Sequence, residues 1–124
     1  MLGSAGLIAF VASSDLDRSA AFYRDALGLA LVEQSEYACV FEANGRMLRV
    51  TAVPEVVRAD YTVLGWQVPD IRAAVRGLKA AGVAFRRYEG MGQDADDVWA
   101  APGGDLVAWF ADPDGHNLSL TQFT

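Results

Sequence analysis

Few side chains in this sequence have the type and spacing that catalysis or metal binding requires. The single histidine, His116, follows a turn, and one histidine cannot build a metal site by itself. We therefore expect a hydrogen-bonded loop residue there, with a catalytic or ligand-binding role as the alternative. The single cysteine, Cys39, lies in the apolar run 37–41, which indicates a buried and inert thiol. No Gly-x-Ser-x-Gly motif is present and no base is evident beside Cys39, so nucleophilic catalysis has no support.

Other polar and aromatic residues could line a binding site. Arg49 stands in an otherwise apolar Met-Leu-Arg-Val segment, where it could bind an anionic ligand group or pair with an internal carboxylate. Trp99 follows the acidic segment 93–97, which is most simply a solvated loop but could attract a cationic ligand. Trp99 and Trp109 could each line a cavity or belong to the core, whereas Trp66 is more typical of the core.

Composition limits the classes of protein and partner. The chain has 124 residues, of which 52% are hydrophobic and 21% charged, as is typical of one globular domain. A net charge of −6 and a pI near 4.5 disfavour nucleic acid and anionic membranes as partners. The one adjacent basic pair, Arg86-Arg87, is predicted to form a solvated edge. A lone cysteine, with no visible signal peptide or bilayer-length apolar run, leads us to expect a soluble, cytoplasmic protein.

The first half of the chain predicts a strand, a helix and three further strands. The apolar segment Leu7–Ala12 leads into Ser14 and Asp15, either of which could cap a helix with an acidic first turn. Four residues recur at helical spacing before Gly28, which suits a helix end: Leu16, Ala20, Tyr23 and Leu27. Strands are expected at about Ala30–Glu33, Ala38–Glu42 and Met47–Val53, with Asn44-Gly45 as a hairpin turn.

The second half repeats this plan. A strand at Thr62–Val68 meets Asp70, which begins a helix that ends at Gly82 and carries Ile71, Val75 and Leu78 on one face. Four strands are then expected, at about Ala84–Tyr88, Val98–Ala101, Val107–Phe110 and Leu118–Phe123. Gly28 and Gly82 lie 54 residues apart (82 − 28), and Asp15 and Asp70 lie 55 apart (70 − 15). Such an offset indicates an internal duplication.

The duplication predicts a fold class. We expect a single α+β domain over residues 1–124, with one module at about 1–53, a charged linker at 54–60 and a second module at about 61–124. Each module is a βαβββ unit whose helix covers only one face of its sheet. Two tandem modules would therefore form a curved sheet around a cavity, a natural place for a small molecule.

Four segments together carry a family resemblance. The turn Asp112-Pro113-Asp114-Gly115 joins two expected strands. The pattern Asp-Leu-x-x-Ser-x-x-Phe-Tyr at 15–23 is followed by Leu27-Gly28-Leu29, and the helix beginning at Asp70-Ile71 by Ala81-Gly82-Val83. These segments resemble the glyoxalase/bleomycin-resistance/dioxygenase family, also called the vicinal oxygen chelate (VOC) family. The resemblance implies paired βαβββ modules with a cavity in each pair, usually in a dimer.

The resemblance also gives the positions at which a metal would be held. Metal-using relatives bind divalent iron, manganese, nickel or zinc through His, Gln or Glu on the first and last strands of the modules. Carried over position by position, these sites fall on Ile8, within 61–64, within 47–51 and on Ser119. Of the residues at 61–64 only Tyr61 could coordinate a metal, and 47–51 contains no His, Asp or Glu. We therefore expect neither the family's metal nor another cofactor.

These observations favour a metal-independent small-molecule-binding protein of the VOC family, similar to antibiotic-sequestering resistance proteins, with a small organic ligand and a homodimeric assembly. We expect no catalytic residue, and the expected ligand-binding residues are Phe10, Arg49, Trp99, Trp109 and Ser119. Relatives that bind small antibiotics tend to place an aromatic residue where Trp109 stands. One alternative is a glyoxalase-, lyase- or dioxygenase-like enzyme with an atypical or absent metal site. Another is a structural or regulatory dimer whose cavity is filled by Phe10, Trp109 and Phe123.

Overall fold

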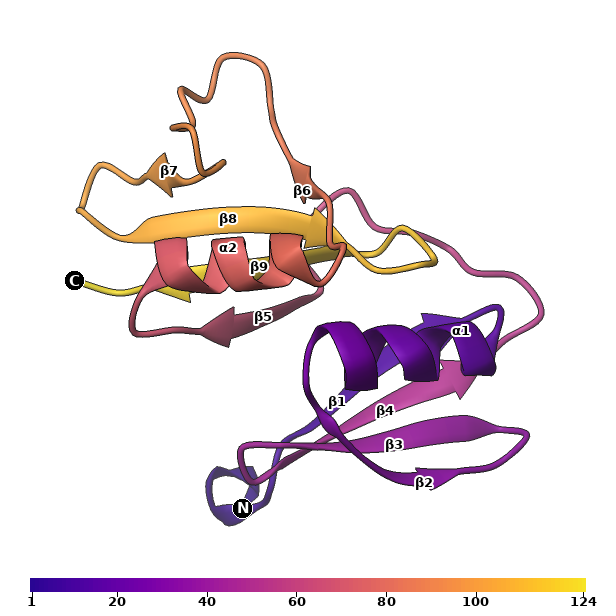
Figure 1. Ribbon diagram of the computed structural model, residues 1–124. Helices are drawn as coiled ribbons and strands as arrows, with labels where there is room; N and C mark the ends of the chain where they lie inside the picture. Colours follow the sequence, from indigo (N-terminus) through magenta and orange to yellow (C-terminus); the bar gives the residue numbers. More distant parts are fainter. The chain divides into compact units, whose positions relative to one another are not determined.

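The computed structural model describes residues 1–124 as two α+β units, Met1–Val57 and Arg58–Thr124, each with a helix packed on one sheet (Figure 1). The boundary between these units falls within the expected linker, residues 54–60. No helix of the chain is long and apolar enough to span a lipid bilayer. The α+β class and the mixed sheets agree with the predicted fold class.

The first unit has a four-stranded sheet in the order β1-β4-β3-β2. Strands β1 and β4 are parallel, and the other neighbours are antiparallel, with a bulge in β2 between Leu31 and Glu33. Its elements in chain order are a short 3₁₀ turn Leu2–Ser4, β1 (Ile8–Ser13), α1 (Leu16–Ala21), a π-helical segment Phe22–Ala26, β2 (Ala30–Gln34), β3 (Ala38–Ala43) and β4 (Arg46–Ala52). The predicted strand–helix–three-strand order is therefore confirmed.

Helix α1 begins as predicted but ends differently. Asp15 is the cap, because its carboxylate accepts the backbone N–H of Arg18. The α-helix stops at Ala21, and the following turn is a π-helix in which the Leu27 N–H reaches the Phe22 carbonyl at 3.1 Å. Gly28 then takes a φ of 78° and ends the helical segment, as expected.

One face of the first sheet is buried under the helix. Tyr23, Phe41 and Val50 are fully buried there, and the rings of Tyr23 and Phe41 lie 5.7 Å apart. The alternation of strand side chains turns Ile8 and Phe10 to the opposite face, where both are exposed. We call the face of each sheet that carries no helix its open face.

The second unit has the sheet order β5-β9-β8-β6, with β7 also paired to β8. Its elements are β5 (Leu64–Gln67), α2 (Ile71–Ala80), β6 (Phe85–Arg86), β7 (Trp99–Ala100), β8 (Leu106–Ala111) and β9 (Asn117–Gln122). Asp70 caps α2 by accepting the Ala73 N–H, and Ile71 and Val75 are fully buried against the sheet, as the helical spacing predicted. Trp66 stacks on Phe110 at 6.2 Å on this helix-covered face, which agrees with its prediction as a core residue.

Strands β6 and β7 both pair with the same edge of β8, one after the other along its length. Arg86 pairs with Trp109, so continuing β6 by two residues would set residue 88 opposite Val107, where Trp99 stands instead. The edge strand is therefore interrupted by an insertion of 11 residues (99 − 88). Once β6 and β7 are counted as one interrupted strand, both units have the same sheet order. The sequence predicted β6 and β7 as separate strands because a strand pattern does not reveal its pairing partner.

The two predicted hairpin turns are confirmed. Asn44 and Gly45 have positive φ values of 49° and 81°, as a two-residue turn between β3 and β4 requires. Between β8 and β9, the Asp112 carboxylate accepts the backbone N–H groups of Asp114 and His116. Gly115 closes that turn with a φ of 84°.

Candidate ligand-binding site

The five residues expected to bind a ligand all lie on open faces. Phe10 and Arg49 are direct neighbours across β1 and β4 in the first unit. Trp99, Trp109 and Ser119 lie together on the open face of the second unit, because Trp109 pairs with Ser119 and its ring lies 6.0 Å from that of Trp99. Because strand side chains alternate between the two faces of a sheet, all five share the side that carries no helix.

On the first unit, the open face joins an apolar surface to an unpaired cation. Phe10 is 64% exposed, and Ile8 and Met47 beside it are also exposed. Arg49 is half-buried and stands between Phe10 and Val40 in the sheet register, and no carboxylate of residues 1–57 lies within ion-pair distance of its guanidinium. Of the two alternatives for Arg49, pairing with an internal carboxylate does not occur within this unit.

A separate small pocket lies on the first unit. Its volume is about 260 Å³, which is below the usual size of a site for a drug-sized ligand. It is lined by Val32, Val40, Phe41, Glu42, Gly45, Arg46 and Met47. None of these was predicted as a site residue, and the bulge in β2 that presents Val32 has no clear sequence signature.

On the second unit, four residues form one row across the open face. Arg86 pairs with Trp109, Trp109 with Ser119, and Ser119 with Gly65, on strands β6, β8, β9 and β5. The row changes from a cation to an aromatic ring, a hydroxyl and a residue without a side chain. Gly65 leaves the room that Ser119 occupies, since a Cβ at residue 65 would lie 2.8 Å from the Ser119 Oγ.

Trp109 is the centre of an aromatic cluster. Tyr88 meets it edge to face, with ring centroids 5.4 Å apart and ring planes at 86°. The ring of Trp99 is tilted, with its plane at 36° to that of Trp109 and the centroids 6.0 Å apart. Tyr88 is 39% exposed and the two indoles are half-buried, so the cluster presents aromatic surface on the open face.

Arg86 and Tyr88 converge on Asn117, a site feature that the sequence analysis missed. Arg86 Nη1 and Tyr88 Oη lie 3.4 Å and 3.3 Å from Asn117 Oδ1, and Arg86 Nη2 donates to the Gly115 carbonyl at 3.1 Å. The prediction of a solvated edge at Arg86-Arg87 is therefore wrong for Arg86, which is half-buried on the open face, whereas Arg87 is exposed and binds the 93–97 segment. The spacing of Arg86 and Tyr88 was the available signal, but only the pairing of β6 with β8 sets Arg86 beside Trp109.

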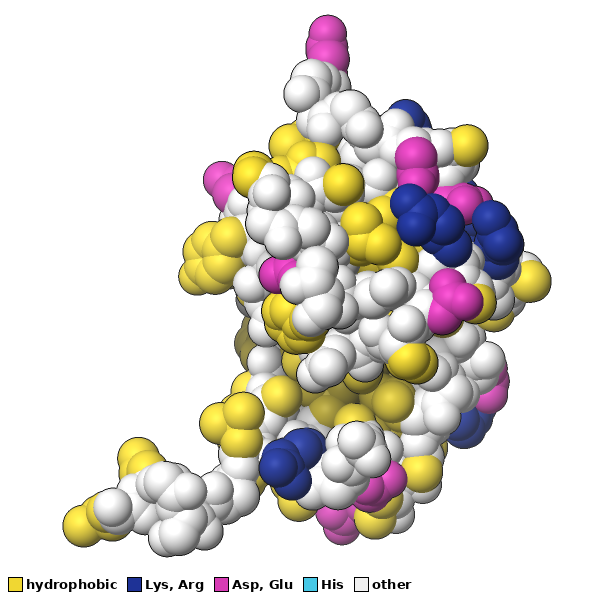
Figure 2. Space-filling view, turned by 90° about the vertical axis from the view of Figure 1, so that its left-hand side faces the viewer, with side chains coloured by type: hydrophobic (Ala, Val, Ile, Leu, Met, Phe, Trp, Pro, Cys, Tyr) yellow, Lys and Arg dark blue, Asp and Glu magenta, His cyan; other side chains and the backbone are white.

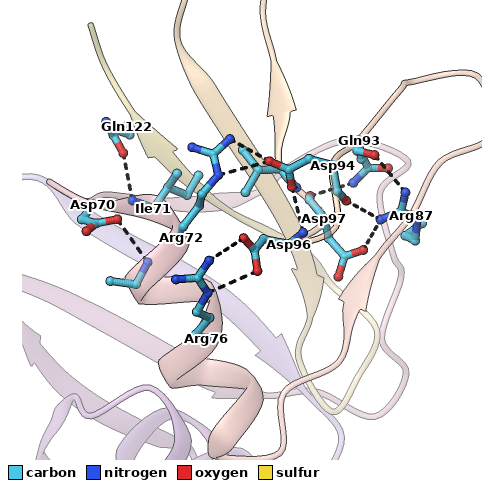
Figure 3. Close-up of polar contacts among 12 residues, drawn as sticks. Asp70, Ile71, Arg72, Arg76, Arg87, Gln93, Asp94, Asp96, Asp97 and Gln122 are labelled. Carbon is cyan, nitrogen blue, oxygen red and sulfur yellow. Dashed lines mark hydrogen bonds and ion pairs between the residues drawn. The ribbon is translucent and has the colours of Figure 1, made fainter.

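The acidic segment 93–97 is not a freely solvated loop. Helix α2 presents Arg72 and Arg76, which pair with Asp94 and Asp96 at 2.7 and 2.9 Å (Figure 3), and Lys79, which pairs with Asp97 at 2.7 Å. Arg87 adds a 2.6 Å pair to Asp97. These cations neutralise the segment from within the chain, which leaves little charge there to attract a cationic ligand.

Two carboxylates in this segment have shifted acidities. Burial raises the pKa of Asp97, but hydrogen bonds and charges from Lys79 and Arg87 together lower the pKa by more than burial raises it, so the net shift is downward. Burial likewise raises the pKa of Asp94, and hydrogen bonds from Arg72 and from the backbone of Val98 and Asp96 reverse the direction. Both groups are therefore held as carboxylates by the basic residues around them.

The two nucleophile or ligand candidates have structural roles. Cys39 is fully buried with its thiol 3.6 Å from the Leu16 carbonyl, and burial, together with the charge of Asp17, raises its pKa. His116 is 5% exposed, and its backbone N–H donates to the Asp112 carboxylate at 2.9 Å. Burial of Cys39 agrees with the prediction of an inert thiol.

The residues present do not fit the metal that the family uses. No group of three His, Cys, Asp or Glu side chains in the chain could hold a metal ion. Among the carried-over positions, the open faces offer the Ile8 side chain on β1, Met47, Arg49 and Thr51 on β4 and Ser119 on β9, and the open-face residue of β5 next to the range 61–64 is Gly65. Hydroxyl groups and a cation do not replace the imidazole and carboxylate ligands of such a centre.

Large hydrophobic side chains are exposed on both units, and Figure 2 shows hydrophobic groups interspersed with charged ones on one face of the surface. Phe10 and Phe123, which the filled-cavity alternative requires to be packed inside, are 64% and 57% exposed. Lys and Arg side chains lie beside Asp and Glu side chains on the same view.

Comparisons with known proteins agree on the fold. A glyoxalase family protein from Bacillus anthracis has 14% identity and a TM-score of 0.76, covering 98% of this chain and 96% of its own. A lactoylglutathione lyase from Agrobacterium tumefaciens has 21% identity and a TM-score of 0.71, covering 96% and 93%. A glyoxalase-related enzyme from Fulvimarina pelagi has 23% identity and a TM-score of 0.72, covering 97% and 88%. At these identities the likeness shows the fold alone.

A comparison with curated protein sequences gave no significant match. The family model of the Glyoxalase/Bleomycin resistance protein/Dioxygenase superfamily, in contrast, matches residues 6–120. This match spans both units and includes the four segments that carry the resemblance. The chain therefore belongs to the Glyoxalase/Bleomycin resistance protein/Dioxygenase superfamily.

Proposed function

We propose that this protein binds a small organic molecule on the open faces of its sheets, without the metal centre that VOC enzymes use. In this respect it is similar to members of the superfamily that confer resistance by sequestering an antibiotic. The observation that supports the proposal most is the donor chemistry of the former ligand positions, which include Ile8 and Ser119 but no imidazole or carboxylate. We further propose that the protein is a cytoplasmic homodimer.

The same faces have groups that suit binding. Phe10, Trp99 and Trp109 provide apolar area, and removing such area from water stabilises a complex by ~25 cal/mol per Å². Arg49 and Ser119 supply a cation and a hydroxyl that would orient the ligand. The exposure of Phe10 and Phe123 favours an available surface over a cavity filled by the chain's own side chains.

Elemental analysis of protein purified without chelator tests the metal-free part of the proposal. We expect no transition metal near one ion per chain, and a stoichiometric ion would contradict the proposal. The enzyme alternative predicts turnover of a dicarbonyl, an epoxide or a catechol that a chelator abolishes, so these substrates are assayed on the same preparation with and without chelator.

Ligand screening by thermal shift tests the binding part. A bound molecule raises stability by mass action, by about 2.7 kcal/mol at a ligand concentration of 100 times Kd. Trp109→Ala is expected to reduce the response to any molecule that binds this face. Trp66→Phe is the matched control, because Trp66 stacks on Phe110 under the helix. Equal responses of the two variants would argue against a site on this face.

A further inference from the structure

Within the second unit, the row from Arg86 to Gly65 has a chemistry that selects among small molecules. This inference rests on the proposed function and concerns the class of ligand. We propose that the open face of the second unit binds a planar aromatic carboxylate, with its ring on Trp109 and its carboxylate on Arg86.

Arg86 provides a positive charge with no internal counterion. Its two side-chain hydrogen bonds go to neutral acceptors, the Gly115 carbonyl and the Asn117 amide oxygen. No carboxylate of the chain forms an ion pair with it, in contrast to Arg72, Arg76 and Arg87. A guanidinium has five N–H donors, so Arg86 keeps three for a ligand. A half-buried, unneutralised guanidinium favours an anion, and its planar fork favours a carboxylate that accepts two parallel hydrogen bonds.

Arg86 is also fixed in position. Its two hydrogen bonds hold it at the β8–β9 turn, and Asn117 is in turn hydrogen-bonded to Tyr88 and to Thr62. The turn contains two carboxylates of its own, and that of Asp112 accepts backbone N–H groups rather than Arg86. A cation held this way needs little ordering when a ligand binds, which favours affinity.

The neighbouring surface favours a flat ring. Arg86 pairs directly with Trp109, so a group on the guanidinium lies one strand from the indole. The rings of Tyr88 and Trp99 both contact Trp109, at 86° and 36° to the plane of its indole. Aromatic pairs in such offset and edge arrangements are favoured beyond their buried area. An aliphatic ligand of equal size would lose this part of the interaction.

The other end of the row adds a polar contact and space. Ser119 follows Trp109 in the row, and Gly65 beyond it has no side chain. A ring that extends from Trp109 toward β5 would meet the Ser119 hydroxyl and no bulky residue. A ring bearing a hydroxyl or carbonyl group at that end would match the hydrogen-bonding capacity of Ser119.

Calorimetric titration with three matched probes tests the proposal on the wild-type protein. Naphthoate carries both features, naphthamide has the ring without the charge, and decahydronaphthoate has the charge without the aromatic ring. We expect naphthoate to bind about 10-fold more tightly than either analogue, a difference of about 1.4 kcal/mol, because each analogue loses either the charge-assisted hydrogen bond or the aromatic contact. Equal binding of naphthoate and naphthamide, or no naphthoate binding, overturns the proposal.

Two variants assign the preference to residues. Arg86→Gln keeps a neutral hydrogen-bond donor on the side chain but removes the charge, and it should abolish the preference for naphthoate over naphthamide. Arg49→Gln removes the unpaired cation of the other open face and should leave that preference unchanged. Loss of the preference in Arg49→Gln with retention in Arg86→Gln would contradict the assignment. Should Arg86→Gln not fold, the probe series on the wild type still decides.

The outcome is separable from that of the proposed function. Binding of a neutral or cationic molecule in the thermal-shift screen, with no naphthoate binding, would leave the proposed function standing and overturn this inference. A stoichiometric metal ion in the purified protein would overturn the metal-free function whatever the probe series shows.

Discussion

At the residue scale, Ser119 is packed closely against the neighbouring strand β5. Its hydroxyl occupies the space above Gly65 on the neighbouring strand, and the residue as a whole is 7% exposed. A long ligand side chain at residue 119 would extend past this space, whereas serine fills it. The two residues are therefore best understood as a pair, and their coupling can be measured.

We predict that the effect of Gly65→Ala depends on residue 119. In the wild type the new Cβ would lie 2.8 Å from the Ser119 Oγ, so the hydroxyl must move and the substitution should cost about 1 kcal/mol. In a Ser119→Ala background that atom is absent, and because φ at residue 65 is not positive, alanine should stabilise by about 0.5 kcal/mol through the unfolded chain. Urea unfolding of the four proteins in this cycle gives the coupling. An equal cost in both backgrounds would show that the contact is unimportant.

At the element scale, the inserted segment between β6 and β7 is held by α2. The helix supplies three cations at successive turns, Arg72, Arg76 and Lys79, and each meets one aspartate of the segment. Figure 3 shows the pairs that Arg72 and Arg76 form. Asp97 differs from the other two because it is 8% exposed, has a positive φ of 62° and pairs with two cations. Asp97 is therefore the aspartate of the segment that forms ion pairs both with helix α2, through Lys79, and with Arg87.

We predict that Asp97→Asn makes stability less dependent on acid pH. The folded-state pKa of Asp97 is lowered from its ordinary value of 3.8, so its carboxylate stabilises the fold above about pH 4 and this contribution is lost as pH falls below that value. Asparagine tolerates the positive φ but removes the charge, which should cost roughly 1–2 kcal/mol at neutral pH. When denaturant unfolding is measured from neutral to acidic pH, the difference in free energy of unfolding between the wild type and Asp97→Asn should become smaller as the pH falls.

The matched control for this prediction is Asp96→Asn. Its partner Arg76 has a side chain that is 67% exposed, and such surface pairs contribute about 0–1 kcal/mol. The control should therefore lose less stability at neutral pH. A loss at Asp97→Asn that stays constant as the pH is lowered would contradict the role given to its charge.

Elements and their order could be predicted from the sequence, but pairing could not. The helix caps Asp15 and Asp70 and the turns at 44–45 and 112–115 act within a few residues, so local chemistry identifies them. Trp109 and Ser119 were each expected at a binding site, and it is the pairing of β8 with β9 that sets them side by side on one open face. The row that includes Arg86 depends on the register of β6 against β8, and the 11-residue insertion (99 − 88) hides that register. The ion pairs of 93–97 were also missed, because their partners lie on α2 and only the packing of the inserted segment against this helix brings the charges together.

At the scale of the whole molecule, the open face of the first unit leaves apolar side chains in contact with water. Ile8, Phe10 and Met47 are neighbours in the β1–β4 register and are 45%, 64% and 40% exposed. Exposed apolar patches of neighbouring side chains commonly mark an interaction site. A homodimer that covers such a face would remove this surface from water, and the family resemblance favours the same assembly.

We predict that the ligand-free protein sediments as a dimer and that Phe10→Glu shifts it toward the monomer. A charge at residue 10 would have to be buried in the interface, at a cost of several kcal/mol, whereas in the monomer it would remain hydrated. Val57→Glu is the matched control, because Val57 is 85% exposed and lies outside both sheets. It adds the same charge and should leave the dimer intact. A wild type that remains monomeric at all concentrations would contradict the prediction. Equal dissociation of both variants would also contradict it, because the effect would then come from net charge, which is already −6, rather than from the open face.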